Sequence, residues 1–188
     1  MNFFDSFFKK DNDRKNMNFS LEIGPHTDLE TLPSVKDVYV TMLPGGDYRD
    51  TAQKSGDLVK KGFNPVPHFP SRSIFNEVEL KDYISRCKDV GVNQALVIGG
   101  SRDPIGKFDS SIQILETGFF EGIKIGVAGH PEGSPDISDT ELEKAMIDKK
   151  PYADYIVTQW LLDSQPIVDF ISKQSVPVHV GITGPMKI

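Results

Sequence analysis

Polar side chains recur where short apolar runs of this chain end, which is where the catalytic groups of parallel β/α proteins gather. The first of them, Glu22, closes an otherwise apolar run, and a carboxylate there would be costly to bury without a task or a partner. A carboxyl group held in a pocket can act as a general acid or base. The other candidates at the ends of runs are Thr41, His68, Arg102, Asp103, His130 and Gln159.

Each of these candidates, taken singly, also has a structural explanation. Thr41 is a common strand residue, and His68, beside two prolines, could be a core histidine whose hydrogen bonds are satisfied. Asp103 could shape a turn, and Gln159 could cap a layer of side chains. Polar residues at the ends of six successive runs nevertheless favour one shared pocket, and we predict an active site there.

The elements that must position these residues alternate along the chain. Segments of helical periodicity, the clearest from Glu77 to Val90, separate apolar runs of strand length. Asn76 with Glu79 and Ser138 with Glu141 resemble the capping boxes that begin helices. The expected strands are Phe19 to Ile23, Val38 to Met42, Pro65 to Phe69, Ala95 to Ile98, Ile123 to Ala128, Tyr155 to Thr158 and Val176 to Ile182.

Alternating strands and helices, with strands too apolar to have one wet face, are typical of parallel βαβ units. The glycine fingerprints of two common open-sheet nucleotide folds are absent from the sequence, which favours a TIM (β/α)8-type barrel. About seven strands and six helices fit in the chain, against eight of each in a complete barrel. Seven strands leave the first and the last as unpaired edges, so we expect the chain to be part of a longer protein.

The composition excludes several classes of function. A formal net charge of -6 and the absence of a basic stripe argue against a nucleic-acid partner. The apolar runs are too short to span a membrane, so we expect a cytoplasmic protein. Cys87 should be a packed thiol in a reducing compartment, and the dispersed histidines predict no metal site. We expect residues 1–18, rich in Phe, to form an N-terminal arm, and residues 19–188 to form the incomplete barrel.

Several segments resemble the methylenetetrahydrofolate reductase family, whose catalytic domain is an FAD-binding β/α barrel. Leu21 to His26 is similar to the motif of its first strand, and Val40-Thr41 and Pro67-His68 are similar to those of the next two. The most specific matches are Val127 to Gly133, which resembles Ala-Gly-Tyr-Pro-Glu-Gly, and Ala153 to Gln159, which resembles Ala-Asp-Phe-Ile-Ile-Thr-Gln. The resemblance covers about Ser20 to Pro185.

The resemblance implies that NAD(P)H reduces a bound FAD, which then reduces methylenetetrahydrofolate to methyltetrahydrofolate, in one-carbon and methionine metabolism. Glu22 would be the general acid that protonates a folate nitrogen. Asp103 and Gln159 would bind the folate substrate. The residues that would hold the flavin and its phosphates are Thr41, His68, Arg102, Asp103, Asp109, His130 and Lys149.

The sequence departs from the family pattern at several of these positions. Arg102 directly precedes Asp103, His130 replaces a usual Tyr, Ser134 replaces a usual His, and the phosphate-binding Lys falls at Lys149. Trp160, where Phe or Leu is usual, alternates away from Gln159, and we expect it to pack between the strands and the helices of the barrel. Two alternatives stay open: a flavin-free or oxidatively running folate enzyme of the same family, and a degenerate barrel without catalysis. A barrel lyase would need a Schiff-base Lys at a strand end, and the sequence places none there. A homo-oligomer is also left open.

Overall fold

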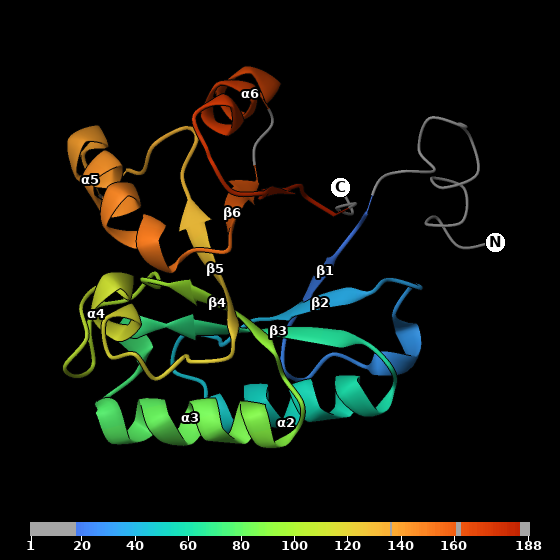
Figure 1. Cartoon of the computed structure of the whole chain (residues 1–188). Helices are drawn as coiled ribbons and strands as arrows, with labels where there is room; N and C mark the ends of the chain where they lie inside the picture. Colours follow the sequence, from blue (N-terminus) through green and yellow to red (C-terminus); the bar gives the residue numbers. More distant parts are fainter. Residues whose placement is uncertain (1–17, 136, 161–162, 185–188) are drawn as a thin grey trace, which may run out of the picture.

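A computed structural model describes residues 18–135, 137–160 and 163–184, so the expected N-terminal arm lies almost wholly outside the described residues. Seven strands form one all-parallel sheet, in which each strand pairs with the next along the chain (Figure 1). All seven expected strands are confirmed, with ends that differ by a few residues. They are β1 (Leu21–Ile23), β2 (Asp37–Val40), β3 (Asn64–Pro70), β4 (Gln94–Ile98), β5 (Lys124–Gly129), β6 (Tyr155–Trp160) and β7 (Val178–Gly181).

Five α-helices lie among the described residues, not the six that the sequence predicted, and short 3-10 helices make several of the other connections. The described strands form a curled sheet that is open between β1 and β7, so a closed barrel is not formed by this part of the chain (Figure 1). The helices are α2 (Tyr48–Lys60), α3 (Glu77–Asp89), α4 (Ser111–Leu115), α5 (Asp139–Lys149) and α6 (Ser164–Ser172), with 3-10 helices η2 (Leu29–Thr31), η3 (Ser71–Ser73) and η4 (Lys150–Tyr152).

Helix α2 was not placed by sequence periodicity, because small and polar residues interrupt the apolar spacing of the face that it buries. Thr51, Ser55 and Gly56 are among its buried residues, and the Ser55 hydroxyl donates to the Thr51 carbonyl at 2.8 Å. A side chain at Gly56 would lie 3.2 Å from Cβ of Val90 at the end of α3. Small residues therefore let α2 pack closely, and apolar spacing does not reveal them.

The two predicted capping boxes differ in the structure. Ser138 and Glu141 form both reciprocal contacts at the start of α5, as expected. Asn76 accepts a hydrogen bond from the Glu79 backbone at the start of α3, but the Glu79 carboxylate accepts from the Phe75 backbone, one residue earlier. The second box is therefore only half formed.

The main core lies between the sheet and helix α3. Phe69 on β3 stacks on Tyr83 of α3 with ring centroids 4.1 Å apart, and Phe120 meets Phe69 edge-on. Cys87 is fully buried in the same cluster, as predicted, and burial raises the pKa of its thiol to about 12. This thiol is a packing group.

The outer face of the last strands is less well covered. Helix α6 contains no buried residue, and Trp160 at the end of β6 is 56% exposed. The expectation that Trp160 packs between strand and helix is therefore wrong, because more than half of its surface stays exposed. Other exposed apolar residues of this region are Val168, Ile171, Val180 and Ile182.

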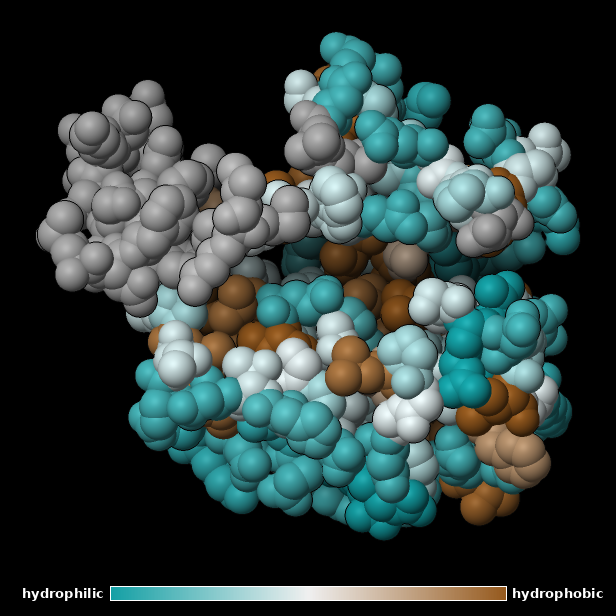
Figure 2. Space-filling view, turned by 180° about the vertical axis from the view of Figure 1, so that it is seen from behind, coloured by the Kyte–Doolittle hydropathy of each residue, from teal (hydrophilic) through white to brown (hydrophobic). Residues whose placement is uncertain are grey.

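The inner face of the curled sheet carries a contact between its two ends. The hydroxyl of Tyr39 on β2 lies 2.8 Å from Nδ1 of His179 on β7, and the His179 ring stacks on Tyr155 of β6. In the space-filling view, hydrophobic residues gather in a hollow between the part with α2 and α3 and the part with α5 and α6 (Figure 2). The sheet therefore encloses an interior that is open on one side. No helix among the described residues is long and apolar enough to cross a membrane.

Candidate functional site

Glu22 and His68 meet inside the curl of the sheet. They come from β1 and β3, and alternation along the strands places both on the inner face with Tyr39 of β2. His68 Nε2 lies 3.8 Å from Glu22 Oε2. The His68 side chain is only 9% exposed, whereas that of Glu22 is 63% exposed. A buried imidazole thus lies beside a carboxyl group that a ligand can reach.

His68 is held as a neutral imidazole. The Tyr83 hydroxyl donates to its backbone carbonyl at 2.9 Å, and Tyr39 meets its ring edge-on. Burial lowers the pKa of His68 to about 4. Its Nε2 is buried and has no hydrogen-bond partner in the part of the chain that the structure describes. Buried polar atoms without a partner are rare, so this nitrogen is a candidate contact for a ligand or a neighbouring acid.

The carboxyl group of Glu22 is shifted toward its neutral form. Burial by the surrounding strands raises the pKa of Glu22 above its ordinary value. Among the described residues, the one basic side chain within ion-pair distance is His68, which is itself neutral near pH 7. A carboxyl group with a raised pKa and access to a pocket can donate a proton.

Thr41 follows the end of β2 and ties it to β1. Its backbone N–H and its hydroxyl both donate to the Ile23 carbonyl, at 2.9 and 3.2 Å. The same residue accepts a hydrogen bond at its carbonyl from the Thr51 hydroxyl of α2, at 3.4 Å. Thr41 thus lies at the predicted strand end, where it braces the backbone beside Glu22.

The loop after β4 carries three of the predicted residues. Arg102 is half-buried and Asp103 is exposed. Asp109 is exposed and forms an ion pair with Arg72 of η3, with Oδ1 3.5 Å from Nε. The Arg72 guanidinium also donates to the Asp109 carbonyl at 2.8 Å. Asp109 is therefore engaged in holding the loop, and among the described residues no hydrogen bond or ion pair joins Asp103 to Glu22.

The loop is pinned further along at Gly106. A Cβ at this position would lie 2.0 Å from the Phe75 carbonyl oxygen, and the next residue, Lys107, donates its backbone N–H to that same oxygen. The glycine is needed for this close approach. The loop is thereby fastened to the segment that leads into α3.

Two further predicted site residues, His130 and Gln159, lie at the ends of strands β5 and β6. Gln159 is exposed near the end of β6, where the register with β7 shifts between Val157 and Trp160. His130 directly follows β5 and is half-buried, and burial together with the nearby Lys149 lowers the pKa of its imidazole. Both residues are at the strand ends, as predicted.

Lys149 reaches β5 from the last turn of α5. It is 6% exposed, and its ammonium donates to the Ala128 carbonyl at 2.9 Å. Burial lowers the pKa of Lys149 to about 8. A buried lysine without a carboxylate partner is costly, because one carbonyl does not replace the water that the ammonium loses. Since the amine is covered and bonded, it is a poor candidate for the Schiff base of a lyase.

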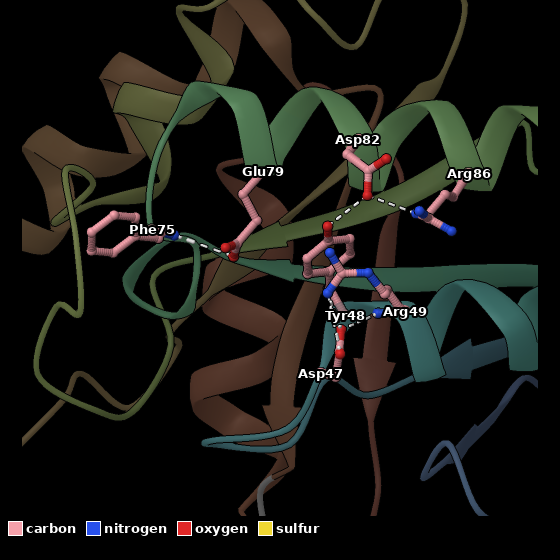
Figure 3. Close-up of polar contacts among 7 residues, drawn as sticks. All are labelled: Asp47, Tyr48, Arg49, Phe75, Glu79, Asp82 and Arg86. Carbon is pink, nitrogen blue, oxygen red and sulfur yellow. Dashed lines mark hydrogen bonds and ion pairs between the residues drawn. The ribbon is translucent and has the colours of Figure 1, made fainter.

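A second polar cluster lies outside the sheet, between α2 and α3 (Figure 3). The Tyr48 hydroxyl and Arg86 Nε both donate to Asp82 Oδ2, at 2.5 and 2.6 Å. Arg49 bonds to Asp47, the N-cap of α2. In Figure 3 the contact between Tyr48 and Asp82 crosses from α2 to α3, and the other contacts lie at the start of α2 or along α3, so this cluster joins the two helices.

Tyr39, Tyr155 and His179 are interior residues that the sequence did not single out as a group. The alternation of β2 could have placed Tyr39 on the face of Glu22, because the two residues are register partners. The contact between Tyr39 and His179 joins residues 140 positions apart in the chain. No local pattern reports such a pairing.

No family model matches this chain. The fold resembles a crystal structure of a "putative lyase/mutase" from Burkholderia cenocepacia J2315, with a TM-score of 0.58 at 13% sequence identity. The match covers 82% of this chain and 63% of that structure, so the chain spans less than two thirds of its neighbour. At this identity the likeness shows the α/β fold with its curled parallel sheet, and no activity.

Proposed function

We propose that this chain belongs to an enzyme that reduces 5,10-methylenetetrahydrofolate to 5-methyltetrahydrofolate with NAD(P)H, by means of a bound FAD. The observation that carries the proposal is the acid at the inner face of the sheet: Glu22 is accessible, its pKa is raised, and it lies beside the buried His68. This residue occupies the position at which the sequence motif of β1 requires an acid. The placement of Thr41, His130 and Gln159 at strand ends is consistent with the same pocket.

The residues around the inner face fit a flavin. A side chain at Gly99, directly after β4, would meet no atom within 4 Å, so a planar ring can approach the backbone there. Thr41 and His130 would lie beside the ring, and Arg102, near Gly45 of the β2–α2 loop, would face its phosphates. When bound, the flavin supplies the transfer of hydride from the nicotinamide to the folate.

The phosphate contact proposed for Lys149 would use the part of its ammonium group that does not bond to β5. Its ammonium already donates to the Ala128 carbonyl, and the side chain is covered by α5 and β5. Two further N–H donors of an ammonium group can still take an anion. Asp109 would act through Arg72, with which it is paired.

Glu22 would supply the proton of the reaction. Its O–H bond breaks as the proton passes to a ring nitrogen of the folate, and the carbon–nitrogen bond of the five-membered ring then opens to an iminium. Hydride addition to the iminium carbon gives the methyl group. Asp103 and Gln159 would orient the folate by hydrogen bonds. A raised pKa serves this role because it favours the proton-bearing form of the acid.

The test separates flavin binding from proton donation. Purified protein should be yellow, or should become so on reconstitution with FAD. The substitution Glu22→Gln should leave reduction of the flavin by NAD(P)H intact and slow its reoxidation by methylenetetrahydrofolate at least ~100-fold, which is the usual contribution of a general acid. Glu143→Gln, at an exposed position of α5, is the matched control. A protein that binds no flavin would refute the proposal that FAD is the cofactor. Normal reoxidation in Glu22→Gln would refute the proposal that Glu22 is the general acid.

A further inference from the structure

The polar groups around Glu22 on the inner face are occupied, with one exception. On β2, the Tyr39 hydroxyl pairs with His179 Nδ1. After β2, the Thr41 hydroxyl donates to the Ile23 carbonyl. On β3, His68 Nε2 has no partner in the described chain and lies 3.8 Å from Glu22 Oε2. Among these groups, His68 is therefore the one that is free to pair with the acid.

The distance between the two side chains exceeds a hydrogen bond by about 1 Å. The backbone of His68 is fixed by the hydroxyl of Tyr83, and its ring lies against Tyr39. The Glu22 side chain is 63% exposed and has room to rotate. The buried imidazole is thus the fixed partner, and the carboxyl group is the one that moves to meet it.

We propose that Nε2 of His68 accepts a hydrogen bond from the protonated carboxyl group of Glu22, so that His68 is a positioning residue that keeps this acid in its proton-bearing form. The imidazole then carries its own proton on Nδ1. The opposite arrangement would need a carboxylate facing an Nε2–H group. Glu22 has no Lys or Arg in an ion pair among the described residues to support that negative charge.

The electrostatic environment agrees with this arrangement. Burial favours the neutral form of both partners, because it raises the pKa of Glu22 and lowers that of His68. Among the described residues, Tyr39 of β2 is a titratable neighbour of Glu22, and beyond it lie Tyr155, His179, Asp37 and Lys124. Burial and Lys124 lower the pKa of His179, so it brings no positive charge. A ligand that fills the interior would expel water from Glu22 and leave His68 as its partner.

The pairing has a consequence for proton donation, which rests on the proposed function. After the proton has passed to the substrate nitrogen, the Glu22 carboxylate faces an unprotonated Nε2, an unfavourable contact. A proton from solvent restores the acid. His68 thus opposes loss of the proton to solvent before the substrate arrives. The O–H group must then turn away from Nε2, which breaks this hydrogen bond, before the proton passes to the folate nitrogen.

The experiment reads the tautomer of His68 by ¹⁵N NMR of histidine-labelled protein at pH 7, where this imidazole is neutral. We expect the wild-type ring to be predominantly the Nδ1–H form. Glu22→Gln should keep this form, because the amide N–H can donate to Nε2 in place of the carboxyl group. Glu22→Leu should shift the ring predominantly to the Nε2–H form. A wild-type Nε2–H ring, or an unchanged ring in Glu22→Leu, would overturn the proposal.

His179 provides an internal control in the same spectra. Tyr39→Phe removes the hydroxyl bonded to His179 Nδ1, so it should alter the His179 signals and leave the tautomer of His68 unchanged. An equal change in both rings would show a general response of the interior and would also count against the pair. The spectra need neither flavin nor folate. If the protein binds no flavin but shows these tautomers, the pairing of Glu22 with His68 is supported and the proposed flavin-dependent reaction is refuted.

Discussion

The helices beside the early strands of the curled sheet bury far more apolar side chains than the helices beside its later strands. Helix α3, beside β3 and β4, buries Leu80, Tyr83, Ile84 and Cys87. Helix α5 fully buries only a lysine, Lys149, and α6 has no buried residue at all. Figure 1 shows α2 and α3 side by side under the first strands, whereas α5 and α6 flank the later strands on the other side of the hollow.

This difference in packing indicates which part of the candidate site is held firmly by its neighbours. His68 belongs to the well-packed side, where the Tyr83 hydroxyl from α3 fixes its backbone, and Glu22 lies beside it on β1. His130 and Gln159 belong to the side with little buried helix surface. A catalytic group needs a supporting shell that does not move. We therefore expect His68 to be the rigid member of the pair, and Glu22 to be the member that moves.

The largest expected effect tests this contrast with one residue type. Ile84 on α3 is 3% exposed and Ile171 on α6 is 40% exposed. Ile84→Ala should lower the free energy of unfolding by about 3 kcal/mol, because it leaves a cavity in the main core. Ile171→Ala should cost about 1 kcal/mol or less, because part of its surface stays in water. Urea denaturation of both variants measures the difference. Equal losses of unfolding free energy in the two variants would contradict the difference in packing between α3 and α6.

Replacement of Lys149 should have an intermediate effect on the free energy of unfolding, and it should raise this energy rather than lower it. Its pKa of about 8 in the folded chain lies below the ordinary value of 10.5, so the unfolded chain binds this proton more tightly. Below pH 8 this difference opposes folding by up to ~3 kcal/mol, and the opposition fades as the pH rises from 8 to 10.5.

Lys149→Met should therefore stabilise the protein at pH 7 by ~2 kcal/mol, after allowance for the Ala128 carbonyl that loses its donor. Wild-type stability should rise between pH 8 and 10.5, and the variant should lack that rise. Thermal denaturation across this range gives the comparison. Lys144→Met, an exposed position on the same helix, is the control and should show no such change. Destabilisation by Lys149→Met at pH 7 would contradict the interpretation.

The smallest expected effect concerns the start of α5. Ser138→Ala removes the side chain that accepts the Glu141 backbone N–H, and should cost about 1 kcal/mol, as helix N-caps usually do. Because α5 buries so little, the loss should appear as faster amide hydrogen exchange within α5. Ser138→Asp, which can accept the same hydrogen bond, should restore protection. Uniform exchange across all helices in Ser138→Ala would show that α5 does not open separately.

Much of the fold could be predicted from the order of apolar runs and turn residues. All seven strands lie where those runs occur, and the capping pair Ser138 and Glu141 begins α5 as its spacing indicates. Helix α2 was not predicted from the sequence because it buries Thr51 and Ser55, which do not contribute to an apolar periodicity. The prediction for Trp160 was wrong because strand alternation gives the direction of a side chain and not what covers it.

The sequence by itself determined which polar residues stand at the strand ends, because alternation and run length are local properties of the chain. Only the tertiary structure decided which of them meet. Glu22 and His68 are brought together by the curl of the sheet, and Tyr39 reaches His179 across its interior. Burial depends on every strand and helix around a group. For that reason the unpaired nitrogen of His68 and the covered ammonium of Lys149 became visible only in three dimensions.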